Sequence, residues 1–331
     1  MADERAKALA SDQGRKLPVL FIHDAAIDDF IATMLLVAMP NVDLRGIVIA
    51  NADCIPEPGI DAANRLQQFI GRPDIPLALS EARGWNPFPW EYREDCVRFG
   101  ELPILRPYRS TVPTPPPSGD RLVAELLERA TRSGERLVVL LTTGFTPLTD
   151  VIRARPELIE GIACVVWMGG AINVPGNLDP KTLPKVVCNK HAEWNVFWDP
   201  FAAQDGLDMV SEIHDFPLDI TNTVPIAKPF MARLKQQGAR FSFSQLAYDA
   251  YSLVSAEPFY DMWDVCTTVF LARPDLYAAP QQMHLGVVQW GFEQGWLHPV
   301  QGAGNTQHVY LGFDDLDGFY DYVATQLARS A

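Results

Sequence analysis

The sequence has little of what proteins use to bind polyanions or to build disulfide frameworks. Its 331 residues contain 27 Lys and Arg against 41 Asp and Glu, which gives a formal net charge of −14 at pH 7. A phosphate-binding surface needs an excess of cationic side chains, so this balance argues against nucleic acids and anionic membranes as partners. The five cysteines include no C-x-x-C pair, so we expect neither a zinc site nor a redox dithiol. Reduced thiols favour a cytoplasmic protein.

Long hydrophobic runs are absent too. No apolar stretch approaches the roughly 20 residues that cross a bilayer, and the opening segment MADERAKALASDQGRK lacks the apolar core of a secretory signal. We therefore predict a flexible tail at residues 1–17. With 48% hydrophobic residues, the remainder can bury a large core. Because no repeat or long linker divides it, residues 18–331 are predicted to form a single domain.

Short β-rich runs alternate with helical patterns through the first two thirds of the chain. Strands are predicted at residues 19–23, 44–50, 136–142, 164–168 and 214–220, and helices at 28–38 and 59–71 follow the first two. This alternation predicts an α/β fold with a Rossmann-like, mostly parallel central sheet flanked by helices. Later segments predict helices at 225–237, 241–255 and 263–273, strands near 284–290 and 307–312, and a closing amphipathic helix.

Polar or glycine-containing turns follow four of the predicted strands. Asp24, Asp28 and Asp29 lie where the first strand meets its helix, and residues 51–54, 142–144 and 168–171 follow the next strands. In open parallel sheets, ligands bind beyond the carboxyl ends of the strands. We therefore expect these four turns to form one site.

The three carboxylates are close enough to repel one another, which raises their pKa unless a cation or strong donors compensate them. Asp28 and Asp29, taken singly, have a plainer explanation as acids that stabilise the first turn of a helix, and so does Asp264 in a later helix. Asp24, Asp28 and Asp29 together favour a hard cation such as Ca²⁺, which takes about 6–8 oxygen ligands. The motif is not an EF-hand loop, so further ligands must come from elsewhere in the chain.

Eight segments resemble a known family in order along the chain. HDAAIDD resembles the D-x-D-P-G-x-D-D signature of the nucleoside hydrolases, and the likeness extends to about residue 275 through GIVIANADC, NPFPWEYR, LTTGFTPLTD, VVWMGGAINVPGN, HAEWNVFWDP, LDITNTVP and MWDVC. Several of these segments are similar to the purine-preferring inosine-adenosine-guanosine branch. The resemblance implies a calcium-dependent homodimer of purine salvage that hydrolyses the N-glycosidic bond of ribonucleosides, releasing base and ribose.

The resemblance also implies a set of metal ligands. Asp24, Asp29, Asp264 and the carbonyl of Thr143 would hold Ca²⁺, and Asp24 would act as general base toward a calcium-bound water. Thr142 is the alternative carbonyl ligand, because TGFTPLT is two residues longer than the family's T-G-P-L-T.

Substrate contacts follow from the same resemblance. Asp28, Asn195 and Asp264 would bind the ribose diol, Asn177 and Glu193 the 5′-hydroxyl, and Asp53 the base. Negative groups near the sugar stabilise the oxocarbenium character of the transition state. Asp53 has a plainer alternative as a turn or cap residue.

Activation of the leaving base would depend on aromatic side chains. Trp263 occupies the position of a proton-donating His in the inosine-uridine branch, and an indole face stabilises a cationic purine. The family's second stacking residue aligns with Tyr92, and Trp90 is its rival. Loop packing is the plainer explanation for both.

Four residues depart from the family pattern, and the first is Tyr92, which stands where the family has a Trp. Ile22 replaces a second carboxylate, and Ala25 and Ala26 replace residues that are usually Pro-Gly or Gly-Asn, which removes a ribose contact. Two alternatives therefore stay open: a hydrolase of pyrimidine or modified nucleosides, and a catalytically weakened protein that binds ribose or calcium.

Overall fold

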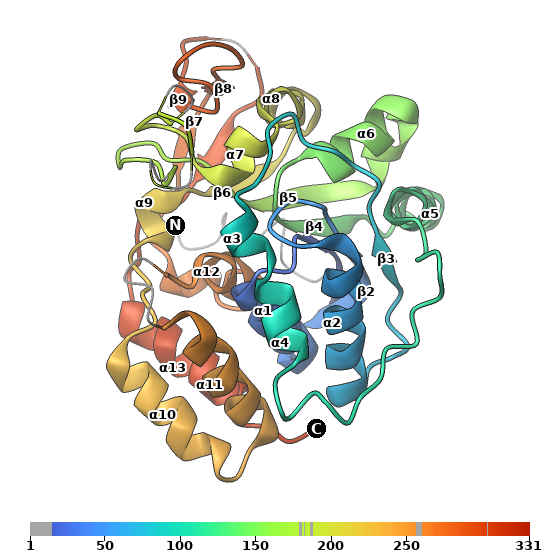
Figure 1. Cartoon of the computed structure of the whole chain (residues 1–331). Helices are drawn as coiled ribbons and strands as arrows, with labels where there is room; N and C mark the ends of the chain where they lie inside the picture. Colours follow the sequence, from blue (N-terminus) through green and yellow to red (C-terminus); the bar gives the residue numbers. More distant parts are fainter. Residues whose placement is uncertain (1–14, 179–180, 182, 186–187, 256–259, 303) are drawn as a thin grey trace.

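The computed structural model describes residues 15–178, 181, 183–185, 188–255, 260–302 and 304–331. The tail predicted at 1–17 therefore lies outside the described residues, apart from its last three positions. One sheet of eight strands forms the centre of the fold, in the order β3-β2-β1-β4-β5-β6-β10-β7 (Figure 1). The strands are β1 Leu17–His23, β2 Val42–Ile49, β3 Leu77–Leu79, β4 Leu137–Thr142, β5 Ile162–Met168, β6 Ile213–Phe216, β7 Gln281–Met283 and β10 Gln307–Val309.

Every pairing in this sheet is parallel except that of β7 with β10. The predicted mostly parallel sheet is thus confirmed. The strand order reverses between β1 and β4, where His23 pairs with Thr142. Crevices that bind ligands open at such reversal points, because the connections leave the sheet there in opposite directions.

Helices cover both faces of the sheet. On one face lie α1 Ile27–Ala38, α2 Pro56–Phe69, α4 Asp95–Gly100, α10 Lys228–Gly238, α11 Ser242–Val254, α12 Trp263–Val269 and α13 Leu316–Gln326. The other face carries α5 Gly119–Ser133, α6 Thr146–Ala154, α8 Pro200–Met209 and the small sheet of β8 Leu285–Val287 and β9 Leu297–Pro299. The apolar faces of the strands are therefore buried on both sides, as a parallel sheet requires.

The remaining helices are short: α3 Trp90–Arg93, α7 Trp194–Trp198, α9 Leu218–Thr221, and the 3₁₀ turns η2 Pro156–Gly161 and η3 Pro274–Leu276. In the described part of the chain, no helix has the length and apolarity needed to cross a membrane.

Several predicted boundaries were wrong. The strand predicted at 214–220 ends at Phe216, because Pro217 has no N–H for the sheet and α9 begins after it. The helix predicted at 263–273 ends at Val269. The strand predicted near 284–290 is the shorter β8, which pairs with β9 outside the main sheet.

The turn from β1 into α1 passes through Ala25, whose φ of 62° lies in the left-handed region. This conformation costs a residue with a Cβ roughly 1–2 kcal/mol. It is held by a hydrogen bond from the Ala25 N–H to Nδ1 of His23, at 3.1 Å. Burial lowers the pKa of His23 to about 3, so its imidazole is neutral and able to accept. His23 thus stabilises the turn that places Asp28 and Asp29 beyond the end of the strand.

Candidate active site

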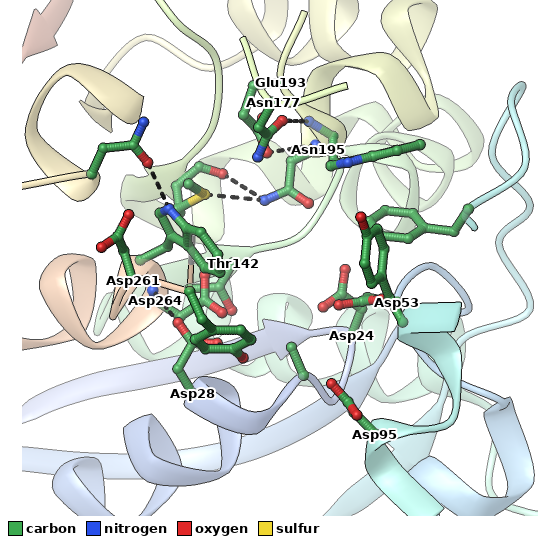
Figure 2. Close-up of a pocket in the computed structure, with 18 of the residues that line it drawn as sticks. Asp24, Asp28, Asp53, Asp95, Thr142, Asn177, Glu193, Asn195, Asp261 and Asp264 are labelled. Atoms are coloured by element: carbon green, nitrogen blue, oxygen red, sulfur yellow. Dashed lines mark hydrogen bonds between the residues drawn. The ribbon is translucent and has the colours of Figure 1, made fainter. Parts of the chain in front are cut away.

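A cavity of about 540 Å³ lies beyond the carboxyl ends of β1, β4 and β5. Among the residues predicted for the site, those that line it are Asp24, Asp28, Asp53, Tyr92, Asn177, Glu193, Asn195, Trp263 and Asp264. Residues far apart in the sequence therefore meet at the strand reversal, as the turns had predicted. In Figure 2, Asn177, Glu193 and Asn195 gather at one end of the view, and Asp28 and Asp264 at the other.

Asp28 and Asp29 point in different directions from the first turn of α1. Asp29 accepts a hydrogen bond from the Ala26 N–H at 3.0 Å and one from Thr142 Oγ1 at 2.6 Å. Its bond to Ala26 is the capping role that the sequence left open. Asp28 does not cap α1, because its Oδ2 accepts from the backbone N–H of Asp264 at 2.8 Å. Asp28 thus ties α1 to α12.

The carboxyl groups of this cluster lie close enough to share protons. The carboxyl groups of Asp24 and Asp29 lie close together, and so do those of Asp28, Asp29 and Asp264. Burial, and next the charge of Asp29, raises the pKa of Asp28 to about 7. Burial also raises the pKa of Asp29 to about 6, and it raises the pKa values of Asp24 and Asp264 well above their ordinary range.

A hard cation fits the chemistry of this cluster. Among the described residues, no group of three acidic, imidazole or thiol side chains is placed so that it could hold a metal ion. However, the carboxyl group of Asp29 lies beside those of Asp24 and Asp264, so the three predicted ligands converge on one another. Carboxylate oxygens are the ligands that Ca²⁺ prefers, and a cation in place of the shared protons would lower these pKa values.

The end of β4 presents Thr142 to the cavity. Thr142 lines it, and its hydroxyl donates to Asp29. Thr143 is buried and does not line the cavity, and its carbonyl accepts a hydrogen bond from Trp167 Nε1 at 3.2 Å. The alternative Thr142 thus lies closer to the open space than the predicted Thr143. Which carbonyl binds a metal stays a prediction.

The residues predicted for the 5′-hydroxyl lie around the start of α7. Glu193 is the N-cap of this helix and accepts hydrogen bonds from three backbone N–H groups, those of Gly170, Asn195 and Val196. Burial raises its pKa to about 7. Asn177 accepts a hydrogen bond from the Trp194 N–H at 3.2 Å, and within the described residues its own amide N–H groups have no acceptor, so they can donate into the cavity.

Two local features fix the positions of Asn177 and Asn195. A Cβ at Gly176 would lie 2.0 Å from the carbonyl oxygen of Ala192, so only glycine lets the loop carrying Asn177 approach α7 this closely. Asn195 donates through Nδ2 to the carbonyl of Met168 at 3.0 Å. Its Oδ1 has no hydrogen bond within the described residues and remains an acceptor for a hydroxyl.

The structure separates the two aromatic candidates on α3. Tyr92 lines the cavity and packs edge-on against Trp194, with ring centroids 6.5 Å apart. Trp90 is 66% exposed and does not line the cavity. Residues two apart on a helix point to nearly opposite sides, so only one of the pair can face the cavity. Asp53 also lines it, and Oδ1 of Asp53 is buried without a hydrogen bond in the described part of the chain.

Comparison with known proteins places this arrangement in a family. Residues 19–317 match the family of inosine-uridine preferring nucleoside hydrolases. The chain belongs to this family. The crystal structure of an inosine-uridine preferring nucleoside hydrolase from Bacillus anthracis covers 95% of this chain and 100% of its own, with a TM-score of 0.84 and 30% identity. The predicted fold, family and hydrolysis of N-glycosyl bonds are therefore confirmed, and a protein that only binds ribose or calcium is not supported.

Other relatives of this nucleoside hydrolase are named after different preferred bases. The pyrimidine-specific ribonucleoside hydrolase RihA of Klebsiella pneumoniae is 28% identical, over 94% of this chain and 98% of that protein. A purine-preferring ribonucleoside hydrolase from Gardnerella vaginalis has a TM-score of 0.77 over 94% of this chain and 98% of its own, but its 17% identity shows the fold alone. Family membership therefore leaves the preferred base open.

Sequence reasoning missed several residues that line the cavity of this nucleoside hydrolase: Phe88, Asp95, Trp194, Asn222, Tyr260 and Asp261. Tyr260 donates from its hydroxyl to Oδ1 of Asp28 at 3.1 Å. Burial, and next the charge of Asp28, raises the pKa of Asp261 to about 7. Phe88 and Asn222 lie inside quoted motifs, so their segments could have pointed to them. Tyr260 and Asp261 precede Trp263 without any spacing that marks a site.

The raised pKa values predict how the stability of the metal-free nucleoside hydrolase depends on pH. Asp28 and Glu193 have pKa values of about 7, so the folded protein holds protons that the unfolded chain has already lost. Each such proton lowers the free energy of unfolding by about 1.4 kcal/mol per pH unit. The pKa values of His23 and His214 are lowered to about 3. They therefore reduce the free energy of unfolding mainly below pH 6.5, the ordinary histidine pKa, where the unfolded chain binds protons that the folded protein does not.

The unfolding temperature of the chelator-treated protein should therefore fall as the pH rises from about 6.5 to about 8.5, because stability is lost as these acids ionise in the folded state. Differential scanning calorimetry across this range measures it, and saturating Ca²⁺ should flatten the decline. A metal-free unfolding temperature that stays level or rises would show that the cluster is not protonated.

Proposed function

We propose that this nucleoside hydrolase is calcium-dependent and prefers purine ribonucleosides. One observation supports the base preference above all others. Trp263 stands in the cavity directly before Asp264, and no histidine of the described residues lines that cavity. Because an imidazole acid is missing from the described lining, the leaving base must be activated in another way.

Asp24, Asp29, Asp264 and a carbonyl at the end of β4, that of Thr143 or Thr142, would hold the Ca²⁺ ion. When bound, the ion supplies a positive charge that makes a water more acidic and attracts the ribose diol. Asp28, Asn195 and Asp264 bind the diol, and Asn177 and Glu193 bind the 5′-hydroxyl. The unbonded Oδ1 of Asn195 supports this assignment.

Asp24 takes the proton of the attacking water. As the water oxygen bonds to C1′, the bond from C1′ to the base nitrogen breaks and its electron pair leaves with the base. Positive charge develops on the ribose in this transition state, and the ionised carboxylates around it stabilise that charge. Asp24 must be ionised to accept the proton, so the enzyme needs the cation that displaces protons from the cluster.

Trp263 and Tyr92 activate the base by stacking, and Trp90 takes no part because it is exposed. A purine can accept a proton at N7, and aromatic faces stabilise the cation that results. The buried Oδ1 of Asp53 accepts a hydrogen bond from the base. Uracil has no comparable basic nitrogen, so stacking activates it poorly.

A pyrimidine substrate is the competing proposal, supported by the similarity to the pyrimidine-specific RihA. Measuring kcat/KM for inosine, guanosine, adenosine, uridine and cytidine under one set of conditions decides between the two. We expect every purine nucleoside to exceed both pyrimidine nucleosides. Uridine equal to or above inosine would overturn the purine preference and favour the alternative.

A homodimer, a cytoplasmic location and a role in purine salvage are part of the proposal on the strength of the family resemblance. Light scattering of the purified protein tests the oligomeric state directly. A monomer at micromolar concentration would contradict the dimer.

A further inference from the structure

The indole of Trp263 is held in place by two neighbours. Its Nε1–H donates to Oδ1 of Asn222 at 2.8 Å, and its ring lies 4.9 Å from that of Tyr260, at an interplanar angle of 54°. All three residues line the cavity. A tryptophan side chain turns about two bonds, so these contacts select one orientation of the ring among several.

The fold brings Asn222 to Trp263 through two paired segments. Asn222 ends α9, and its N–H donates to the carbonyl of Leu218 at 3.1 Å. Just beyond it, the Met262 N–H donates to the carbonyl of Val224 at 2.9 Å, and Pro225 forms a β-bridge with Asp261. The positions of Asn222 and Trp263 are therefore fixed relative to each other by the backbone.

The start of α9 is anchored in turn. The carboxylate of Asp219 accepts hydrogen bonds from the backbone N–H groups of Ile172 and Asn173, both at 2.8 Å. The segment that carries Asn222 is thus tied to the loop after β5. The backbone that carries Asn222 is therefore held on both sides of this residue.

We propose that Asn222 is a positioning residue, which sets the ring plane of Trp263 for stacking on the base. Only one edge of an indole carries an N–H, so the bond to Asn222 fixes the direction of that edge and, with it, the plane of the ring. The proposal rests on the stacking role of Trp263 in the proposed function. Stacking stabilises the protonated base mainly in the transition state, so Asn222 should affect kcat more than KM.

A direct contact with substrate is the competing explanation, because Asn222 is exposed and lines the cavity. Its Nδ2 has no hydrogen bond within the described residues, and this group could donate to a nucleoside. Two substitutions separate the explanations. Asn222→Asp keeps the oxygen that accepts from Trp263 but removes the amide donor, and Asn222→Leu removes both.

The test is a double-mutant cycle with Asn222→Leu, Trp263→Phe and the double variant, measured on whichever nucleoside the wild type hydrolyses fastest. Phenylalanine keeps an aromatic ring but has no N–H to donate. We expect Asn222→Leu to lower kcat about three- to tenfold, the value of a neutral hydrogen bond, with a smaller change in KM. In the Trp263→Phe background the same substitution should cause no further loss. Asn222→Asp should stay within about twofold of wild type, because it keeps the acceptor.

Thr223→Val is the matched control, since this exposed neighbour bonds through its hydroxyl to the carbonyl of Ile220 and not to the indole. It should leave kcat unchanged. An equal loss from Asn222→Leu in both backgrounds, or a loss in Asn222→Asp as large as in Asn222→Leu, would overturn the positioning role. If uridine is hydrolysed fastest, the purine preference is contradicted. The cycle then still measures the coupling between Asn222 and Trp263.

Discussion

Asp24→Asn is expected to give a folded enzyme whose kcat is lower by about 10²- to 10⁴-fold, the usual effect of losing a general base. The amide keeps an oxygen at the same place but cannot take a proton from water. Asp24 is buried beside the carboxyl group of Asp29, and an amide of the same shape can occupy that position. Release of free base from inosine at saturating Ca²⁺ measures the effect.

Asp43→Asn serves as the control for this prediction. Asp43 lies on β2 and pairs with Arg45 on the surface, away from the cavity. Its substitution should leave kcat unchanged. Circular dichroism and the unfolding temperature establish that both variants are folded. A folded Asp24→Asn protein with the kcat of wild type would show that another group activates the water.

Asp264→Ala should remove the stabilisation by Ca²⁺ and lower kcat/KM strongly, because one carboxylate is proposed to bind both metal and ribose. A ligand that binds only the folded state stabilises it by about 2.7 kcal/mol at a concentration of 100 Kd. We therefore expect Ca²⁺ to raise the unfolding temperature of the wild type and to leave that of Asp264→Ala nearly unchanged. The backbone N–H that Asp264 donates to Asp28 survives the substitution, so the link between α12 and α1 is kept.

Asp261→Ala is the matched control in this experiment. Asp261 lies three residues earlier and lines the same cavity, but it is not among the proposed ligands. Ca²⁺ should raise the unfolding temperature of this variant as it does that of the wild type. Equal increases in wild type and Asp264→Ala would mean that Asp264 does not bind the ion.

The parts of the site that could be predicted from sequence are those carried by short apolar strands and the turns after them. Asp24, Asp28 and Asp29 follow β1 directly, so finding that strand was enough to place them at the edge of the sheet. The choice between Tyr92 and Trp90 could not be made in the same way. It depends on which side of α3 faces the cavity, and a single turn of helix shows no periodicity.

The contacts that hold Trp263 and Tyr260 in place could not be predicted from the sequence, because they join distant segments. Asn222 and Trp263 are 41 positions apart, and Tyr260 and Asp28 are 232 apart. Nothing in a local pattern records such pairs. The sequence could not identify the carbonyl at the end of β4 either, because the two extra residues of TGFTPLT shift the alignment. The structure shows that Thr142 lies next to the acids, because β4 pairs with β1 there and the Thr142 hydroxyl donates to Asp29.

We propose that the aspartate cluster works with a calcium ion to hydrolyse nucleosides. The most direct measurement is the release of hypoxanthine from inosine by protein freed of metal with a chelator, before and after Ca²⁺ is added back. We expect almost no release from the metal-free protein and recovery of the original rate with Ca²⁺. Metal-free protein that hydrolyses inosine as fast as the calcium-loaded enzyme would contradict it.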